Sequence, residues 1–310
     1  MAAMPNTLSP SAWLRRPTAQ NTSTQTTSTP SHAGLGCLSM QREYRPGRAV
    51  DPGAAVNLDS SGMNDHSQGR VAVVTGAGSG IGRAIALALA ARGDRVIAAD
   101  LDEAAAAATA RQRPELITAS PVDVADPAQV DSLRDRTHTD VGVPNVVVNA
   151  AGWDRTDQFL NATPEFAAKV VAINYLGPVH VCSAFLPGMI ESGPGGRVVN
   201  LASDAGRVGS AGESIYAGAK GGVIALTKSL AREMARHQIT VNCVCPGPTD
   251  TPLFHAQPEK LKEALVKAIP FRRLARPEEV AAPVLFFASD AASFITGQVI
   301  SVSGGLTMAG

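Results

Sequence analysis

The stretch VAVVTGAGSGIG, residues 71–82, decides the fold of this 310-residue chain. A short apolar run typical of a buried strand leads directly into a turn with glycines at positions 76, 78, 80 and 82, and a helical pattern follows. Glycine suits this junction because it tolerates positive φ and lets backbone N–H groups approach a pyrophosphate. The helix N-terminus adds partial positive charge. The stretch predicts a dinucleotide-binding turn, although a glycine-rich turn alone could be merely structural.

Short β-branched runs and longer helical patterns alternate from here to the carboxyl end, which indicates repeated βαβ units. Seven strands are predicted, at Val71–Thr75, Arg95–Asp100, Leu116–Val122, Asn145–Asn149, Arg197–Leu201, Thr240–Cys245 and Val299–Ser303. Helices are predicted at Ile81–Arg92, Asp102–Arg111, Ala128–Arg136, Pro164–Glu191, Ser214–Arg236 and Pro277–Ser289. Parallel strands need crossovers, so helices should cover both faces. The prediction is one α/β domain over residues 69–310, with a Rossmann-type doubly wound seven-stranded parallel sheet.

Residues 1–68 are predicted to be a disordered N-terminal extension. Most of this segment is rich in Ser, Thr, Pro and Gly, with runs such as NTSTQTTSTP at 21–30, and it has no hydrophobic period that could bury a face. It carries Arg15, Arg16 and Arg42 but no acidic residue before Glu43, so an organelle-targeting segment is one interpretation. A dispensable tail on a cytoplasmic protein is the preferred interpretation.

Composition argues against several classes of protein. The 27 basic and 27 acidic residues balance, and no basic block offers a field for nucleic acid. Apolar runs such as Val284–Ala288 are far shorter than the roughly 20 residues that cross a bilayer. The four cysteines, at positions 37, 182, 243 and 245, fit neither a disulfide framework nor a zinc site. We therefore expect a soluble protein without nucleic acid, membrane or metal partners.

Asp100 is the acidic residue at the carboxyl end of the second predicted strand, 18 residues after Gly82. A carboxylate there can accept hydrogen bonds from a ribose diol and would repel a 2′-phosphate. Neither Ser79 nor Leu101 supplies the positive charge that a phosphorylated ribose needs. The pattern favours NAD over NADP. The alternative is that Asp100 only caps the next helix.

Tyr216 is the one tyrosine of three with a lysine four residues later, Lys220. On a helix this spacing places both side chains on one face, where the ammonium would favour the phenolate form of the tyrosine. Ser203, 13 residues upstream of Tyr216, ends a predicted strand and could hold a substrate oxygen nearby. The structural alternatives are a Tyr–Lys pair on the surface of a helix and a turn-forming serine.

Taken together, these motifs resemble the short-chain dehydrogenase/reductase family over residues 69–310. The resemblance rests on TGAGSGIG at 75–82, Asp100, Asp123-Val124, NAAG at 149–152, Asn174, Ser203, YAGAK at 216–220 and PGPTDT at 246–251. It implies a catalytic tetrad of Asn174, Ser203, Tyr216 and Lys220. Tyr216 would take the hydroxyl proton as hydride passes to a nicotinamide ring, Ser203 would polarise the oxygen, and Asn174 would hold a water that links Lys220 to solvent.

The resemblance also implies NAD as the cofactor and a homotetramer as the assembly. The residues it assigns to cofactor binding are Gly76, Ser79, Gly80, Ile81, Gly82, Asp100, Asp123, Val124, Asn149, Gly152, Tyr216, Lys220, Pro246, Gly247 and Thr251. Asp123 would meet the adenine, and Thr251 would approach the pyrophosphate or carboxamide. Ala219 and Ser303 stand where the family often has serine and aspartate, respectively. Neither position belongs to the tetrad.

Three segments beyond the strand ends should select the substrate: 152–159, 204–214 and 252–276. Their motifs, together with the ITGQVISVSGGLTM end, resemble members of the family that oxidise a ring hydroxyl of an alicyclic acyl-CoA. A CoA tail could meet Lys260, Lys262, Lys267, Arg272 and Arg273, which could equally be the solvated side of a helix. The alternatives are a 3-oxoacyl thioester reductase, a general alcohol, steroid or sugar dehydrogenase, and a catalytically silent dinucleotide-binding sensor.

Overall fold

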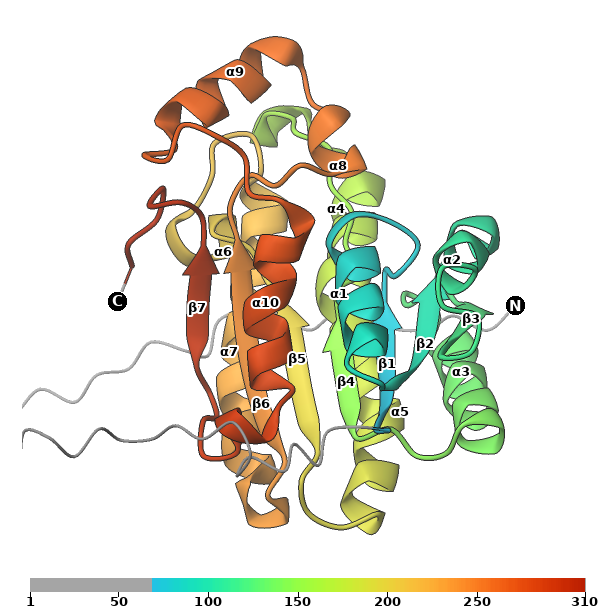
Figure 1. The fold of residues 1–310 in the computed structure, drawn as a ribbon. Coiled ribbons are helices and arrows are strands. Elements are labelled where there is room, and N and C mark those ends of the chain that lie inside the picture. Colours follow the sequence, from blue (N-terminus) through green and yellow to red (C-terminus); the bar gives the residue numbers. More distant parts are fainter. Residues whose placement is uncertain (1–68, 310) are drawn as a thin grey trace, which may run out of the picture. The chain divides into compact units, whose positions relative to one another are not determined.

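A seven-stranded sheet with every pair of neighbouring strands parallel forms the centre of the computed structural model, which describes residues 69–309 (Figure 1). The predictions made for residues 1–68 lie outside the described residues. The strands run in the order β3-β2-β1-β4-β5-β6-β7. Their bounds are β1 Val71–Thr75, β2 Arg95–Asp100, β3 Ile117–Pro121, β4 Val146–Asn149, β5 Arg197–Leu201, β6 Thr240–Pro246 and β7 Val299–Val302. The predicted Rossmann-type α/β class is confirmed, and each predicted strand bound falls within one residue of the observed one.

Helices cover both faces of the sheet. One face carries α1 (Gly80–Ala91), α2 (Glu103–Ala110) and α10 (Pro277–Phe287); the other carries α3 (Pro127–Asp140), α5 (Gly177–Glu191) and α7 (Ser214–Met234) (Figure 1). The remaining α-helices are α4 (Pro164–Val171), α6 (Ala205–Val208), α8 (Pro252–His255) and α9 (Glu259–Ala268). This double cover explains why the central strands are almost uniformly apolar.

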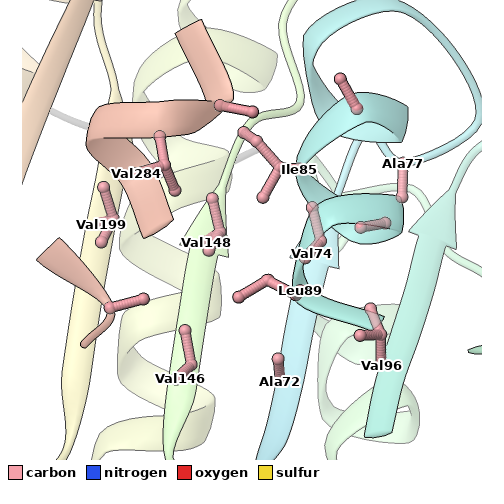
Figure 2. Close-up of a cluster of buried hydrophobic side chains, with 14 of the residues drawn as sticks. Ala72, Val74, Ala77, Ile85, Leu89, Val96, Val146, Val148, Val199 and Val284 are labelled. Atoms are coloured by element: carbon pink, nitrogen blue, oxygen red, sulfur yellow. The ribbon is translucent and has the colours of Figure 1, made fainter. Parts of the chain in front are cut away.

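Alternate residues of each strand feed two separate hydrophobic cores. On β1, Val74 packs with Ile85 and Leu89 of α1 (Figure 2). Val73 belongs to the second cluster, which contains residues of α5. Val284 of α10 joins the first cluster, and the side chains of these residues have no exposed surface. Burial of this kind contributes about 25 cal/mol per Å² of apolar surface, so the two cores hold the sheet rigid beneath the loops.

The helix predicted as one piece over Pro164–Glu191 is interrupted. A π-helical turn, η2 (Ala172–Leu176), separates α4 from α5. Such a turn inserts an extra residue and re-aims the side chains around it. By length and composition alone, the whole run Pro164–Glu191 could cross a membrane. The shorter apolar runs in the sequence gave no sign of such a helix. Half of its most apolar window is buried inside the protein, and a single helix of this kind is weak evidence for a membrane span.

Strands β1 and β4 are neighbours in space although β2 and β3 lie between them in the chain. This is the point where the strand order reverses, and in such sheets ligands bind in the crevice at the carboxyl ends of the strands. The glycine-rich turn after β1 and the loop after β4 both open here, and α8 and α9 lie above the same edge (Figure 1). The two short helices belong to the segment 252–276, for which the sequence pattern predicted a specificity role but no definite helix.

Candidate active site

A cavity of about 690 Å³ opens at this edge of the sheet, within the size range of small-molecule sites. Most residues predicted for the site line it: Gly76, Ser79, Gly80, Ile81, Gly82, Asp100, Asp123, Val124, Gly152, Ser203, Tyr216, Lys220, Pro246, Gly247 and Thr251. Two predicted residues, Asn149 and Asn174, do not line it. Other side chains that line the cavity were not singled out from the sequence: Asp154, Thr156, Lys169, Glu213, Leu261 and Leu265. All of them except Lys169 lie within the three segments that were expected to select the substrate.

The glycine-rich turn is shaped by close backbone contacts that exclude side chains. A Cβ on Gly82 would lie 2.0 Å from the carbonyl oxygen of Gly76, and a Cβ on Gly76 would lie 2.8 Å from the Cα of Ala151. Gly76 also has a φ of 69°, which glycine adopts at little cost. The turn therefore presents bare backbone to the cavity, which is the shape that a bound pyrophosphate requires.

Asp100 is already engaged by the turn it faces. Its Oδ2 accepts a 2.7 Å hydrogen bond from the Gly78 amide, and its Oδ1 accepts one of 2.9 Å from the Asp102 amide. The residue that caps α2 is Asp102, which accepts from the amide of Ala105, so helix capping does not account for Asp100. Each carboxylate oxygen keeps capacity for a further donor. Asp100 can therefore brace the turn and still receive the hydroxyls of a ribose.

Helix α7 brings Tyr216 and Lys220 to the same side of the cavity. The Lys220 Nζ lies 5.7 Å from the centroid of the Tyr216 ring and donates a 2.9 Å hydrogen bond to the carbonyl oxygen of Leu201. Ser203, two residues beyond the end of β5, hydrogen-bonds the phenol, and its Oγ also accepts from the amide of Ala205 at 3.1 Å. The structure thus gathers the three polar groups that the sequence had placed on separate elements.

Burial sets the protonation of this pair. It raises the pKa of Tyr216 above its ordinary value, and the charge of Glu213 raises it further, while the Ser203 hydrogen bond lowers it. Burial also lowers the pKa of Lys220 to about 8. The sequence argument expected the ammonium to favour the phenolate, but in this cavity the cost of burying a phenolate dominates. Additional positive charge is needed before Tyr216 can lose its proton near neutral pH.

Asn174 is completely buried on the π-helical turn and acts on the backbone of the loop after β4. Its Nδ2 donates to the carbonyl oxygens of Trp153 at 2.6 Å and Val170 at 2.9 Å, and its Oδ1 accepts from the Trp153 amide at 3.2 Å. A Cβ on Gly152 would lie 3.1 Å from the Asn174 Oδ1 and 3.5 Å from the Lys220 Nζ. Asn174 and Lys220 therefore flank a bare glycine backbone at the cavity wall.

Asn149 lies deeper, under the floor of the cavity. It is 2% exposed, and its Nδ2 donates to the Oδ1 of Asn200 at 2.8 Å on the neighbouring strand. Asp123 and Val124, by contrast, follow β3 and reach the cavity on the side of Asp100. Within residues 69–309, no group of three or more His, Cys, Asp or Glu side chains could hold a metal ion.

Sequence comparison with known proteins shows to which family the chain belongs. A family model described as enoyl-(acyl carrier protein) reductase matches residues 76–307. The chain is 41% identical over 249 residues to a (3R)-3-hydroxyacyl-CoA dehydrogenase of Rattus norvegicus, covering 77% of this chain and 96% of that protein. The chain belongs to the short-chain dehydrogenase/reductase family. It is therefore an oxidoreductase that acts on CH–OH groups.

Two further relatives of this short-chain dehydrogenase/reductase are named as reductases of acyl thioesters. An acetoacetyl-CoA reductase of Rhizobium meliloti is 42% identical over 240 residues, covering 76% of this chain and 98% of that protein. The 3-oxoacyl-[acyl-carrier-protein] reductase FabG of Escherichia coli is 35% identical over 241 residues, covering 78% of this chain and 98% of that protein. The names of these three relatives refer to hydroxyacyl or oxoacyl thioesters.

The residues present fit the nicotinamide dinucleotide that this family uses. The bare glycine turn accommodates a pyrophosphate, Asp100 faces the place of a ribose, and Lys220 and Tyr216 lie further along the same cavity. When bound, the dinucleotide supplies the hydride acceptor or donor. The chain itself presents the Ser203 hydroxyl, the Tyr216 phenol and the Lys220 ammonium to the same cavity.

Proposed function

We propose that this chain is an NAD-dependent dehydrogenase that interconverts a secondary alcohol and a ketone on a hydroxyacyl thioester. The preferred substrate is an alicyclic acyl-CoA with a ring hydroxyl, as in 2-hydroxycyclohexanecarboxyl-CoA dehydrogenase, which the substrate-facing segments resemble. The single observation that carries the proposal is one continuous cavity with Asp100 at one end and Ser203, Tyr216 and Lys220 at the other.

The side chains divide the proton chemistry between them. Ser203 donates to the substrate oxygen and holds it beside the phenol, and Tyr216 takes the hydroxyl proton as the hydride leaves the carbon. In the reverse direction Tyr216 returns the proton to the ketone oxygen. Lys220, held by the Leu201 carbonyl, keeps a positive charge near the phenol and faces the ribose next to the reacting ring. Positive charge gained on cofactor binding offsets the burial that raises the pKa of Tyr216.

The choice of NAD over NADP is supported by the charges at the Asp100 end. Among the described residues, two cationic side chains line the cavity, Lys169 and Lys220, and neither belongs to the glycine turn or to the segment after β2. Arg83, just after the glycine turn, does not line the cavity, and its guanidinium donates to the Gly78 carbonyl oxygen. A 2′-phosphate would therefore meet the Asp100 carboxylate without a cation on the cavity wall beside it. Two like charges about 6 Å apart repel by roughly 3 kcal/mol at an effective dielectric near 20. This repulsion exceeds the roughly 1.4 kcal/mol that corresponds to the tenfold preference for NAD over NADP that we expect.

The acyl part of the substrate is proposed to lie under α8 and α9. Leu261 and Leu265, one turn apart on α9, line the cavity together with Phe254 of α8. The five basic residues considered for a CoA tail do not line it. Lys262 pairs with Glu259 at 2.6 Å and Arg273 pairs with Glu279 at 2.7 Å. Lys260 and Lys267 are exposed outside the cavity and stay available to the phosphates of a CoA tail.

The second candidate is a reductase of 3-oxoacyl thioesters. It is favoured by the names of the relatives from Rhizobium meliloti and Escherichia coli. The two candidates differ in cofactor and in direction. A reductive role with NADPH would need the phosphate to be tolerated beside Asp100.

The test is a substrate panel with purified enzyme, followed by nicotinamide absorbance. It compares 2-hydroxycyclohexanecarboxyl-CoA and 3-hydroxybutyryl-CoA with the corresponding free acids and with cyclohexanol, each with NAD and with NADP. We expect at least tenfold higher kcat/KM for a CoA thioester with NAD than for any free acid or simple alcohol. Equal kcat/KM for a thioester and its free acid would reject the thioester assignment, and better efficiency with NADP would reject the NAD assignment.

We further propose a homotetramer in the cytoplasm, following the family resemblance and the preferred interpretation of the N-terminal extension. Among the described residues, large apolar side chains such as Phe294 and Phe286 are exposed, and burying them against a second copy would be favourable. Sedimentation at several protein concentrations tests the assembly, since a monomer at micromolar concentration would contradict it. Imaging of the full chain fused to a fluorescent protein tests the location.

A further inference from the structure

The end of the cavity around Tyr216 is rich in carboxylates. Asp154, from the loop after β4, and Glu213, which directly precedes α7, both line the cavity. Asp204 lines it too, but its carboxylate is hydrogen-bonded by the Ser301 hydroxyl, which itself accepts from Arg207 at 2.8 Å. The Asp154 carboxylate accepts from the backbone amide of Arg155, but among residues 69–309 neither it nor the Glu213 carboxylate has a side-chain donor of this kind. Across residues 69–309, neither is within 4.0 Å of a cationic side chain as an ion pair.

Asp154 is only 8% exposed, and its Oδ2 has no hydrogen-bond partner among the described residues. The Oγ1 of Thr156, two residues later and also on the cavity wall, is equally without one. A buried polar atom without a partner typically costs about 1–3 kcal/mol, so each one calls for an explanation, such as a functional role or a donor supplied by a water or ligand in the cavity. The loop therefore holds a buried carboxylate against the cavity at a cost in stability.

The two carboxylates and the phenol interact electrostatically. The charge of Glu213 raises the pKa of Asp154, and the charges of both raise the pKa of Tyr216. Asp154 and Glu213 therefore lie close enough to the Tyr216 phenol to repel a negative charge that is placed beside it. A second negative charge brought in by a substrate would meet the same field.

The cations on the cavity wall do not neutralise this field. The Lys169 Nζ lies 4.1 Å above the centroid of the Trp153 ring, where it is held by a cation–π contact. The Lys220 Nζ is bonded to the Leu201 carbonyl and, under the proposed function, serves the cofactor ribose. Arg155, which follows Asp154, has its guanidinium carbon 5.2 Å from the centroid of the Phe166 ring and is 67% exposed.

We propose that Asp154 and Glu213 exclude an ionised carboxylate from the position next to the reacting carbon, so that the site selects an uncharged acyl derivative such as a thioester over the free hydroxy acid. This inference rests on the proposed function and assigns its selectivity to two residues. Like unit charges about 6 Å apart at an effective dielectric near 20 weaken binding by roughly 100-fold. The apolar side chains of α9 offer the free acid no compensating donor.

The experiment compares a hydroxyacyl N-acetylcysteamine thioester with the corresponding free hydroxy acid, in the presence of NAD. The truncated thioester is uncharged, so the comparison is independent of any contact with the phosphates of CoA. The measured quantity is the ratio of kcat/KM for thioester to kcat/KM for acid. For the wild type at pH 7.5 we expect a ratio of at least about 100. Asp154→Asn and Glu213→Gln should each lower it at least fivefold, and the double variant at least twentyfold.

Asp157→Asn is the matched control, because Asp157 lies on the same loop but does not line the cavity. It should leave the ratio unchanged. Lowering the pH provides a second readout. Burial, with the charge of Glu213, raises the pKa of Asp154 to about 6, and the adjacent Arg155 opposes this shift. Asp154 therefore gains its proton progressively as the pH falls through about 6, and the wild-type ratio should fall between pH 7.5 and about 5.5, where a hydroxy acid is still ionised.

The possible outcomes distinguish a failure of the selectivity mechanism from a failure of the proposed function. If the wild type oxidises the thioester and the ratio is the same in Asp154→Asn, Glu213→Gln and the double variant, the selectivity mechanism is overturned and the proposed function stands. If the wild type oxidises neither compound with NAD, the proposed function fails as well. A ratio that falls equally in Asp157→Asn would also overturn the mechanism, since it would show a general effect of altering the loop.

Discussion

The side chain of Asn174 hydrogen-bonds both polar groups of the Trp153 backbone, donating to the carbonyl oxygen at 2.6 Å and accepting from the amide at 3.2 Å. The π-helical turn that carries Asn174 is thereby locked to the loop that forms the cavity wall. The family resemblance gave Asn174 a role in holding a water near Lys220. The structure adds a mechanical role, because the loop that contains Asp154 begins at this contact.

Asn174→Ala should therefore lower stability as well as turnover. The change leaves buried backbone groups of Trp153 without partners, which costs about 2–4 kcal/mol in the free energy of unfolding. Denaturant unfolding of the variant checks this value, with Asn161→Ala, at an exposed position, as the control. A variant with wild-type stability and impaired turnover would show that Asn174 acts only on the proton path.

Gly152→Ala should slow turnover without unfolding the protein. The new Cβ would lie 3.1 Å from the Asn174 Oδ1 and 3.5 Å from the Lys220 Nζ. It would therefore fill the space between these two side chains, where the family resemblance implies a water molecule. We expect kcat to fall about tenfold or more, measured with the best substrate of the panel. Gly218→Ala is the control on α7, where a Cβ meets nothing within 4 Å and alanine should add about 0.5–1 kcal/mol of stability. Unchanged kcat in Gly152→Ala would refute a function for that space.

Asp100→Asn should erode the preference for NAD. The amide keeps one acceptor for the Gly78 amide but removes the charge that repels a 2′-phosphate. We expect the NAD/NADP ratio of kcat/KM, at least tenfold in the wild type, to fall about tenfold. Asp102→Asn, at the cap of α2, is the control and should keep the wild-type ratio. A wild type that uses both cofactors equally would contradict the role of Asp100.

The repeated pattern along the chain was enough to predict the sheet and most of the cavity. Strand bounds follow from apolar runs buried on both faces, which are local properties of the sequence. The glycine spacing is also visible locally, although the contact that requires Gly76 is with Ala151 in the loop after β4. The motif residues of the cofactor end, from Gly76 to Thr251, line the cavity because the carboxyl ends of parallel strands meet at one edge.

Other features depend on contacts between distant segments and were not predictable in this way. The π-helical turn at Asn174 forms where the helix meets the loop after β4, and no apolar period marks it. Asn149 was expected in the cofactor groove, yet it bonds Asn200 across the sheet. The approach of Glu213 to Asp154 joins segments about 60 residues apart, so the acidic character of the substrate end appears only in the fold.

Protonation of Tyr216 offers a direct spectroscopic prediction. Because burial raises its pKa, the tyrosinate absorbance that is lost in Tyr216→Phe should appear only above pH 10 in the enzyme without cofactor. NAD carries a positive ring, and its binding should shift that absorbance to lower pH by about one unit or more. Circular dichroism at each pH confirms that the protein stays folded. A Tyr216 signal already present at pH 8 without cofactor would contradict the dominance of burial.

The most direct measurement is the turnover of Tyr216→Phe set beside its affinity for NAD. If the phenol of Tyr216 transfers the substrate proton, kcat for the best thioester should fall about 10²–10⁴-fold. The dissociation constant for NAD, measured by calorimetry, should change less than about threefold, because the ring of residue 216 is kept. A variant that binds NAD normally and retains kcat within threefold of the wild type would contradict the account.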